Sequence, residues 1–263
     1  MVLEGIAGVP KFEVHEFSSK KTKYCLCIPI INENGRIQLE LQRAIKHSVH
    51  KAVDIVICDG DSIDGCTDHD LLRTLGVNTL LIKKDIGKQG AQLRMGFWWA
   101  LQRNYDGIIT IDGNNKDSIE SVPLFVGKLN EGYDFIQGSR YIQGGQAINT
   151  PIGRHLAVKF VHAPIISLAA GFRFTDTTSA FRGHSRKYLE HPEVQPFRDV
   201  FMTYELLAYL SVRASQLKLK VCEVPVTRAY PRGEKTPTKI SPLKGNWYLL
   251  KILFETLFGR YRV

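Results

Sequence analysis

Five short apolar runs constrain the fold of this 263-residue chain more than any other feature. Each run has the length of a strand, and most are followed, after a polar turn, by a segment whose apolar residues have helical spacing. The runs are residues 24–31, 53–59, 77–84, 106–112 and 134–140. Strands that alternate with helices in this way predict an α/β fold, with a mixed, mostly parallel sheet flanked by helices.

Polar loops follow three of these runs at the point where each predicted strand ends. They contain Asn32 and Glu33, then residues 59–64, then residues 112–117. Each loop alone is ordinary turn chemistry. Because parallel sheets bind their ligands at the carboxyl ends of the strands, the three loops together predict a binding site at one edge of the sheet.

The composition narrows the class of partner. At 44% hydrophobic and 23% charged residues, the chain reads as a globular protein with a sizeable core. The net charge of +9 favours anionic partners. Nucleic acid is not expected, because the sequence has neither interleaved Arg/aromatic patches nor a helix-turn-helix pattern. Phosphorylated small molecules and an anionic membrane surface remain as candidates.

The cysteines and the chain start bear on the compartment. An odd number of cysteines, mostly within apolar runs, predicts buried free thiols in a reducing compartment. The five are Cys25, Cys27, Cys58, Cys66 and Cys222. The sequence shows no signal-peptide pattern and no window of about 20 apolar residues that could span a bilayer. We therefore expect a cytoplasmic protein whose membrane contact, if any, is peripheral.

The end of the chain is basic and amphipathic. Residues 227–263 contain eight Lys or Arg and two Glu, and the stretch "NWYLLKILFETLFGRYRV" is aromatic, apolar and basic. Its apolar part, 247–258, is too short to span a membrane but is suited to lie in the interface, with its basic residues toward anionic headgroups. The alternative is that it packs on the rest of the protein or forms a dimer contact.

Asp112 is the candidate metal ligand that the residues themselves suggest. It is the first carboxylate after the fourth apolar run, where it can hold a divalent cation against two phosphates. Asp59, after the second run, can accept hydrogen bonds from a nucleobase. A dinucleotide site is disfavoured, because the chain has no P-loop and "GKQGAQLRMG" is not G-x-G-x-x-G. Lys and Arg of the second half can complete a diphosphate clamp.

Eight motifs between Tyr24 and Lys239 resemble family 2 glycosyltransferases, in the order seen in dolichol- or polyprenol-phosphate sugar synthases. They are "IPIINE", "CDGDSIDGCT", "GKQGAQLRMGFWWA", "GSRY", "DTTSAFRG", "YELL", "EVPV" and "RGEK". The resemblance implies the Rossmann-like GT-A fold, a nucleotide-diphosphate-sugar donor carrying UDP or GDP, and Mg²⁺ or Mn²⁺. It also implies three segments, namely an N-terminal extension (1–22), a glycosyltransferase domain (23–240) and a C-terminal basic helix (241–263). Within the domain, 23–140 is the nucleotide-sugar half and 141–240 the acceptor half.

By position, the resemblance also assigns the donor site. The implied donor-binding residues are Pro29, Glu33, Asp59, Lys88, Asp112, Gly113, Asn114, Arg232 and Lys235. Asp112 and Asn114 match the two positions of the family's D-x-D metal motif. Asn114 can ligate through its carbonyl oxygen but adds no charge, so we expect weaker metal binding. Lys116, where many relatives have Gln, can replace part of the cation's charge. Asp117 is either a compensating ligand or a helix N-cap.

The acceptor side leaves alternatives open. Arg140 and Arg154 are implied to bind a lipid phosphate, which is already anionic and needs positive groups rather than a strong base. A hydroxyl acceptor would instead require a general base, for which Asp176 and Glu205 are the candidates. Asp176 can equally be a structural anchor of its loop, with Arg182 as its ion-pair partner, or have neither role.

The sequence therefore predicts an inverting glycosyltransferase that moves a sugar to a polyprenyl phosphate at the cytoplasmic face of a membrane. Its candidate catalytic residues are Asp112, Arg140, Asp176 and Glu205. One alternative is transfer to a hydroxyl of a glycan or lipid-linked oligosaccharide in surface polysaccharide synthesis. Another, motivated by Asn114, is a nucleotide-sugar-binding protein without turnover.

Overall fold

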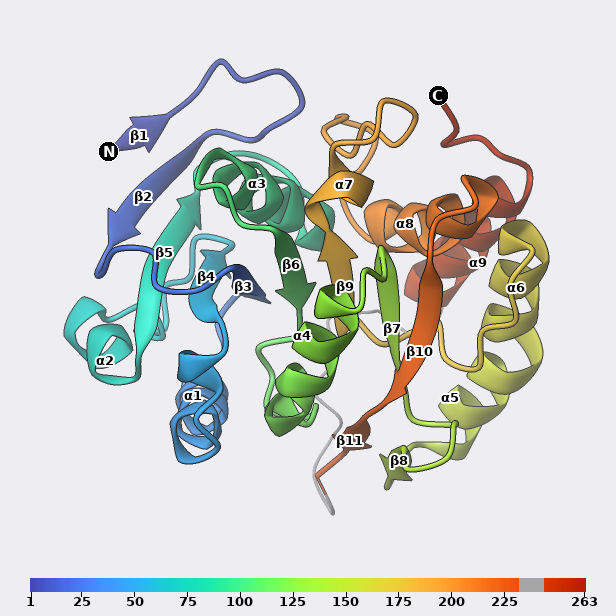
Figure 1. Cartoon of the computed structure of the whole chain (residues 1–263), viewed down its shortest axis with the longest axis horizontal. Coiled ribbons are helices and arrows are strands. Elements are labelled where there is room, and N and C mark those ends of the chain that lie inside the picture. Colours follow the sequence, from blue (N-terminus) through green and yellow to red (C-terminus); the bar gives the residue numbers. More distant parts are fainter. Residues whose placement is uncertain (232–243) are drawn as a thin grey trace.

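A central sheet with helices on both faces organises the chain (Figure 1). The computed structural model describes residues 1–231 and 244–263. Two predicted donor-binding residues, Arg232 and Lys235, lie outside the described residues. Within the described ranges the sheet has nine strands in the order β1-β2-β5-β4-β3-β6-β9-β7-β10.

All five apolar runs form strands, as predicted. They are β3 (Tyr24–Ile30), β4 (Asp54–Asp59), β5 (Val77–Lys83), β6 (Gly107–Thr110) and β7 (Phe135–Ser139). The first four are parallel neighbours, and β7 runs parallel to β10 (Val221–Pro225). β9 (Arg182–Ser185) is antiparallel to both β6 and β7, so these two parallel sets point the same way. Their carboxyl ends therefore meet at one edge.

The remaining strands lie outside the apolar runs. The segment 1–22 contributes β1 (Val2–Leu3) and β2 (Phe12–Glu16), and β2 pairs antiparallel with β5 at the sheet edge. A separate two-stranded sheet pairs β8 (Gln146–Ile148) with β11 (Thr227–Ala229). β9 reads "RGHS", which has no strand pattern of its own; the sheet on either side imposes its conformation.

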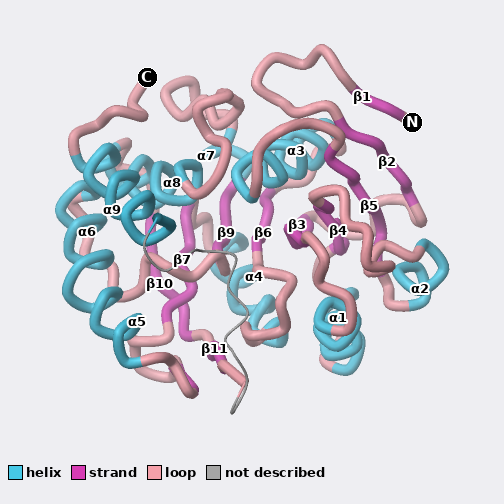
Figure 2. The backbone as a smooth tube through the Cα atoms, turned by 180° about the vertical axis from the view of Figure 1, so that it is seen from behind, coloured by secondary structure: helices cyan, strands magenta, loops and turns pink. Residues whose placement is uncertain are grey.

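Each face of the sheet packs on its own helices. One face is covered by α1 (Arg36–Lys46), α2 (His69–Thr74) and α4 (Val122–Asn130), and the other by α3 (Gln89–Gln102) and α8 (Glu205–Gln216) (Figure 2). Alternation along β3 shows why the strands are apolar throughout: Cys25 and Cys27 face α3, whereas Leu26 and Ile28 face α1. The shorter helices are η1 (Val49–Lys51), η2 (Ile119–Ser121) and α7 (Arg186–Leu189).

One face of α1 is apolar. Its residues Ile37, Leu41 and Ala44 are buried, whereas Ile45 is 38% exposed because it lies at the border of that face. All five cysteines are free thiols, as predicted; four of them are buried as well, whereas Cys222 is partly buried.

A long helical segment follows β8. It consists of α5 (Ile152–Ala157), a π-helical turn η3 (Val158–His162) and α6 (Ala163–Ala170). Pro164 lies in the first turn of α6, directly after the π turn. Proline supplies no N–H to the preceding turn, which accounts for irregular hydrogen bonding at this point.

The chain ends in α9 (Lys244–Leu257), which packs against α6 and α8 (Figures 1 and 2). Ile252 and Leu253 are buried in this contact, whereas Trp247 and Phe258 are 74% and 81% exposed. One side of the helix therefore packs on the protein, as the second alternative states, whereas the other side faces outward and its contact with a membrane stays a prediction. No helix among the described residues has the length and apolar character to cross a bilayer.

Candidate active site

A cavity of about 950 Å³ lies at the carboxyl edge of the sheet, between the sheet and the helices α5, α6, α8 and α9. Glu33, Gly60 and the stretch 112–114 all line it, so the three polar loops meet in one site as predicted. Further lining comes from the start of α3 and from the residues after β7 and β11. Its polar lining residues come mainly from the strand ends and their loops and are mostly cationic; we call this part the polar half. Its apolar lining residues come mainly from the helical segment 152–170, α8 and α9; we call this part the apolar half.

Of the residues predicted to bind the donor, Pro29 and Glu33 line the cavity, whereas Asp59 does not. Glu33 Oε2 accepts a hydrogen bond from Nε of Arg36 at 2.5 Å. Asp59 is 1% exposed and turns into its own loop, where Oδ2 accepts from the backbone N–H groups of Asp61 and Ser62, both at 2.8 Å. Asp59 thus shapes this loop from beneath.

Asp112 and Asn114 lie two positions apart in the sequence after β6, and both line the cavity. Asp112 Oδ1 accepts a hydrogen bond from Nε2 of Gln89 at 3.0 Å. Gly113 between them is required by packing, because a Cβ at this position would lie 2.9 Å from Cγ2 of Ile28. Any side chain would therefore push the loop away from the sheet.

The donor set is compatible with a divalent cation. Asn114 Oδ1 is buried and accepts no hydrogen bond from any described residue, which leaves a carbonyl oxygen free for a ligand beside the Asp112 carboxylate. Among the described residues no group of three or more His, Cys, Asp or Glu is placed to hold a metal. The protein offers two oxygen ligands here, and a bound diphosphate and water would complete the coordination of Mg²⁺ or Mn²⁺.

A buried carboxyl group supports this loop from below. Glu40 of α1 is fully buried, and its Oε2 accepts a hydrogen bond from the backbone N–H of Asn115 at 2.7 Å. Burial raises the pKa of Glu40 well above its usual value, although this hydrogen bond opposes the shift. Asn115 has a φ of +56°, a left-handed conformation that Asn tolerates better than most residues. Glu40 was not predicted, since it lies within the helical pattern of α1.

Cationic groups surround the ring of Tyr230 on the wall of the cavity. Lys116, Arg154 and Arg228 lie 5.5, 5.6 and 5.8 Å from its centroid, and Nη1 of Arg154 donates to the Tyr230 hydroxyl at 2.8 Å. Burial acts to raise the pKa of Tyr230, but Arg228 and Arg154 outweigh it and the pKa lies below its usual value. Burial, and then Arg228, lower the pKa of Lys116. This wall is suited to anions.

Lys116, Arg154, Arg228 and Tyr230 together form what we call the cationic wall, and residues 112–118 form what we call the metal loop. Arg228 links the two. Its Nη2 donates to Asp112 Oδ2 at 3.1 Å, and its Nη1 donates to Asp117 Oδ2. The N-cap role considered for Asp117 is wrong, because Ser118 occupies the N-cap position of η2 and the buried Asp117 carboxylate binds Arg228 instead. Burial raises the pKa of Asp117 to about 6, with Arg228 opposing the shift.

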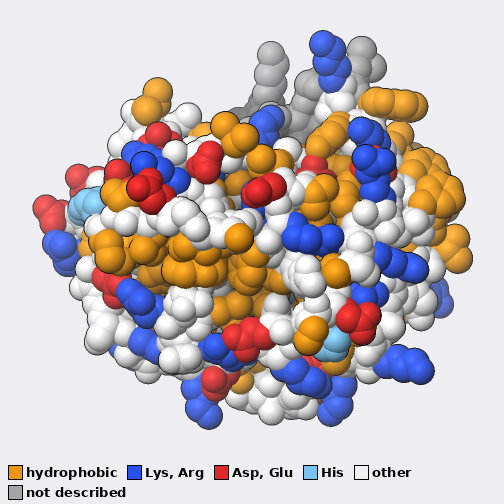
Figure 3. Space-filling model, turned by 90° about the horizontal axis from the view of Figure 1, so that it is seen from above, with side chains coloured by type: hydrophobic (Ala, Val, Ile, Leu, Met, Phe, Trp, Pro, Cys, Tyr) orange, Lys and Arg blue, Asp and Glu red, His pale blue; other side chains and the backbone are white. Residues whose placement is uncertain are grey.

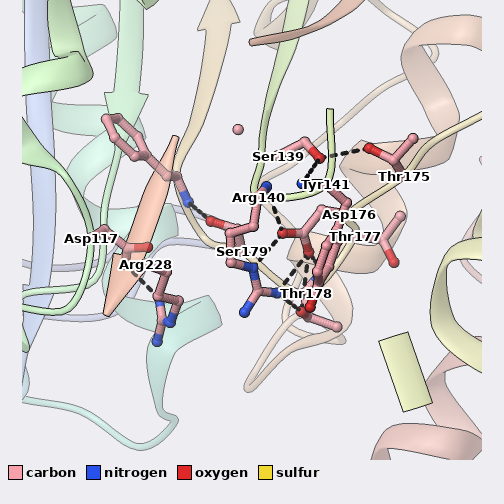
Figure 4. A network of polar contacts seen from close by, with 12 residues as sticks. Asp117, Ser139, Arg140, Tyr141, Thr175, Asp176, Thr177, Thr178, Ser179 and Arg228 are labelled. Carbon is pink, nitrogen blue, oxygen red and sulfur yellow. Dashed lines mark hydrogen bonds and ion pairs between the residues drawn. The ribbon is translucent and has the colours of Figure 1, made fainter. Parts of the chain in front are cut away.

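Arg140 and Asp176 form a buried, two-pronged ion pair (Figure 4). Nε and Nη2 of Arg140 donate to the two oxygens of Asp176 at 2.6 and 2.9 Å, and Nη2 also donates to Thr178 at 2.8 Å. Although burial alone would raise the pKa of Asp176, the Arg140 guanidinium holds it below its usual value. The geometry therefore makes Asp176 the anchor of its loop and presents Arg140 to the cavity, which it lines.

The expected ion-pair role of Arg182 is wrong. Its guanidinium is buried and donates to backbone carbonyls, at 3.0 Å for both Ser179 and Thr177 and also to Leu207. Burial lowers its pKa to about 10, with Asp176 opposing the shift through space. Arg182 thus satisfies carbonyl groups at the loop and at α8, because Asp176 is already fully engaged by Arg140.

Glu205 faces away from the position that a general base would need. Its Oε2 accepts from the backbone N–H of Thr203 at 2.6 Å, and its Oε1 accepts from the hydroxyl of Tyr248 on α9. The neighbouring residues Tyr204 and Leu207 line the cavity instead. The carboxylate therefore satisfies a backbone N–H ahead of α8 and ties α8 to α9.

The remaining predicted residues border the polar half. Lys88 lines the cavity at the start of α3, where its backbone N–H donates to the carbonyl of Met202 at 2.8 Å. Arg154, on α5, lies at the boundary with the apolar half. That half is lined by side chains of α5, η3, α6, α8 and α9. Its lining residues are Ala157, Val158, Val161, Ile166, Leu207, Ala208, Leu249, Leu250, Ile252 and Leu253.

Comparisons with known proteins agree with this architecture. No protein-family model matches the chain. It is 26% identical over 203 residues to an undecaprenyl-phosphate mannosyltransferase of Micrococcus luteus, covering 76% of this chain and 81% of that protein. It is 26% identical to a polyprenol monophosphomannose synthase of Mycolicibacterium smegmatis, with 76% and 75% covered. A dolichol-phosphate mannosyltransferase of Pyrococcus furiosus is 27% identical over 246 residues, with 92% and 63% covered.

Solved structures give the same fold. The crystal structure of glucosyl-3-phosphoglycerate synthase from Mycobacterium tuberculosis, in complex with Mn²⁺, UDP and glucosyl-3-phosphoglycerate, superposes with a TM-score of 0.63 at 16% identity. The match covers 90% of this chain and 79% of that one. The protein is therefore a glycosyltransferase with the GT-A fold. Among such enzymes, as the sequence motifs indicated, it resembles the polyprenyl-phosphate sugar synthases.

Besides Glu40, the sequence reasoning missed two residues of the cationic wall. Arg228 and Tyr230 appeared only as part of the basic tail, yet they form the centre of the cationic wall. Their position directly after "EVPV" was the available signal, since this motif ends a strand at the ligand-binding edge. Which way each side chain points could not be deduced, because the pairing of β11 with β8 decides it.

Proposed function

We propose that the protein is an inverting glycosyltransferase that moves a hexose from a UDP- or GDP-sugar to a polyprenyl phosphate at the cytoplasmic face of a membrane. One observation carries the proposal. A single cavity joins a cationic half, suited to phosphates, to an apolar half, suited to a prenyl chain. A donor and a lipid phosphate acceptor need these two environments next to each other.

The donor occupies the polar half in this proposal. Pro29, Glu33 and Gly60 border the nucleoside, and Lys88 approaches the diphosphate. Asp112 and Asn114 would hold Mg²⁺ or Mn²⁺, and the cation would supply charge neutralisation for the departing diphosphate. Support comes from the unpartnered Asn114 oxygen and from the metal and UDP bound by the structurally similar synthase. Arg232 and Lys235 remain predicted donor contacts.

The acceptor phosphate lies at the junction of the two halves, where Arg140 and Arg154 line the cavity. One phosphate oxygen attacks C1 of the sugar from the side opposite the diphosphate. The new C1–O bond forms as the bond to the diphosphate breaks, and the nucleoside diphosphate leaves with the electron pair. Because the attacking oxygen is already ionised, the arginines need only hold it in line.

The hydroxyl-acceptor alternative has less support. It needs a general base within reach of the acceptor. Both oxygens of Asp176 are bound to Arg140, and Glu205 is bound to Thr203 and Tyr248. Neither group is placed to take a proton from a ligand in the cavity.

We further propose that α5, α6 and α9 bind the membrane surface. Large apolar side chains with high exposure point outward from these helices, and Figure 3 shows such side chains beside Lys and Arg on the side of the molecule where α6 and α9 lie. The most exposed are Ile152 (79%), Phe160 (65%), Leu168 (74%), Trp247 (74%) and Phe258 (81%). This arrangement is typical of interfacial helices on anionic lipid, and it places the apolar half of the cavity next to the lipid.

The test is sugar transfer by the purified chain. UDP- and GDP-hexoses are offered with vesicles that contain either a polyprenyl phosphate or the matching polyprenol. We expect product only from the phosphate, and an Arg154→Gln variant to lose about 100-fold in kcat/KM because one of the groups that hold the acceptor phosphate in line is lost. Transfer to the alcohol or to a glycan, with none to the phosphate, would overturn the proposal.

A further inference from the structure

The backbone around Arg228 is fixed to the metal loop. Asp117 and Arg228 form an antiparallel β-bridge, in which the N–H of Ala229 donates to the carbonyl of Lys116 at 2.8 Å. The N–H of Ser118 donates to the carbonyl of Thr227 at 2.9 Å. These backbone hydrogen bonds hold the guanidinium of Arg228 close to residues 112–118.

The two arms of that guanidinium have different surroundings. Nη1 binds Asp117, whose side chain is fully buried. Nη2 lies 3.1 Å from Oδ2 of Asp112, whose side chain is 22% exposed and lines the cavity. The first arm is an anchor, whereas the second is a contact that an incoming ligand can reach and replace.

We propose that Arg228 is a resident counter-ion of the metal site, which holds Asp112 before the donor arrives and transfers to the donor diphosphate when a divalent cation takes Asp112. This inference rests on the donor and metal roles proposed above. It makes binding of the cation and of the nucleotide mutually dependent. It also assigns to Arg228 a positioning role that neither the sequence motifs nor the relatives assign.

Electrostatic interactions couple the binding of the cation to the binding of the nucleotide. A cation entering at Asp112 and Asn114 competes with Arg228 for the same carboxylate and is repelled by it. Lys116, which lies with Arg228 around the Tyr230 ring, adds to this repulsion. A diphosphate attracts both the cation and the guanidinium, so its arrival removes the conflict. By linkage, the nucleotide must strengthen cation binding by the same factor as the cation strengthens nucleotide binding.

Asn114 increases the dependence of cation binding on the nucleotide. A second carboxylate at this position would hold a cation against the pull of Arg228, whereas a neutral amide supplies only an oxygen. With Asp117 turned to Arg228, Asp112 is left as the charged ligand of the loop. We therefore expect the cation to bind poorly by itself and to enter together with the donor.

The test measures Mn²⁺ binding by electron paramagnetic resonance, without nucleotide and with saturating UDP or GDP. In the wild-type chain we expect the better of the two nucleotides to tighten Mn²⁺ binding by at least about tenfold. Arg228→Lys retains a charge for Asp117 but cannot bridge two carboxylates with a fork. It should bind Mn²⁺ alone about fivefold more tightly than wild type and show correspondingly weaker coupling.

Two further variants keep the outcome interpretable. Asp117→Asn combined with Arg228→Gln replaces the buried ion pair by a neutral pair, and it should also tighten binding of Mn²⁺ alone. Melting temperatures confirm that both variants fold. Asp112→Asn should lose Mn²⁺ under every condition, which identifies the signal as this site.

The possible results distinguish failure of the counter-ion role of Arg228 from failure of the metal site itself. If nucleotide tightens Mn²⁺ binding in the wild type but both Arg228 variants have the wild-type affinity for Mn²⁺ alone, the counter-ion role is overturned and the metal site stands. If the wild type holds no Mn²⁺ with either nucleotide, the proposed metal site fails and the inference fails with it.

Discussion

At the scale of single residues, the buried pair of Arg140 and Asp176 determines what either group can do. Arg140 is 3% exposed and Asp176 is fully buried, so each is the other's main source of compensation for lost hydration. Breaking such a pair from one side costs about 3–5 kcal/mol, because a buried charge is left uncompensated. Positioning and stability are therefore inseparable at Arg140.

This pair gives the first prediction. Asp176→Asn should lower the free energy of unfolding by about 3 kcal/mol or more, and it should reduce kcat without removing the acidic limb of the kcat/KM pH profile. Thermal unfolding and pH-dependent kinetics measure the two effects. Asp199→Asn is the matched control, since Asp199 also pairs with a buried arginine, Arg94, but is itself 79% exposed. Loss of that acidic limb in Asp176→Asn would instead identify a general base.

His184 carries a second prediction at this scale. It is fully buried between Phe97, Phe135 and Tyr188, and neither ring nitrogen has a hydrogen-bond partner among the described residues. Burial, with a smaller contribution from Arg182, lowers its pKa to about 3. The unfolded chain therefore binds a proton below about pH 6.5 that the folded chain refuses, so stability falls as the pH falls from 6.5 toward 3.

His184→Phe removes this proton uptake. The variant should be at least as stable as wild type at pH 7, and between pH 6 and 4 it should avoid a loss of about 1.4 kcal/mol per pH unit. Urea unfolding across this range measures it, with exposed His47→Gln as the control. Identical slopes for wild type and His184→Phe would contradict the assignment.

At the scale of elements, the contact of α8 with α9 gives a third prediction. Tyr248 on α9 donates to Glu205 in the first turn of α8, and a hydrogen bond to a charged acceptor contributes about 1.5–3 kcal/mol. Tyr248→Phe should speed amide hydrogen exchange in 244–257 while the exchange of α8 is retained. Trp247→Phe, at an outward-facing position, is the control. Unchanged exchange in Tyr248→Phe would show that apolar packing alone holds α9.

The same scale shows where sequence reasoning succeeds. The strands β3, β4, β5, β6 and β7 were predictable because continuous apolar runs with polar ends have one favourable place, the middle of a covered sheet. β9 and β2 were missed because neighbouring strands impose their conformation. The meeting of the three polar loops followed from parallel topology, whereas the ion pairs of Arg228 and Arg140 depend on side-chain directions that topology does not give.

At the scale of the whole molecule, the exposed apolar residues of α5, α6 and α9 give a fourth prediction. Replacing both Trp247 and Phe258 by Ser should weaken binding to anionic vesicles at least about tenfold, since each aromatic side chain contributes about 1.5–3 kcal/mol when buried in lipid. Co-sedimentation measures it, and binding by the wild type should weaken as salt rises.

The control for that experiment is Ile63→Ser. Ile63 is 92% exposed but lies in the loop after β4, far from α5, α6 and α9 in the sequence. It should leave vesicle binding unchanged. Equal losses in both variants would show that exposed apolar area binds lipid wherever it lies on the protein, and the proposed membrane face would be wrong.

In the function proposed above, the cavity binds a nucleoside diphosphate together with a divalent cation at Asp112 and Asn114. Calorimetric titration of the wild-type chain with UDP and with GDP, each with Mn²⁺ and with a chelator, tests it most directly. We predict that one nucleotide binds in the presence of Mn²⁺ and loses at least about tenfold in affinity without it. Binding that is indifferent to metal would assign the diphosphate to the cationic wall alone, and binding of neither nucleotide would contradict the account.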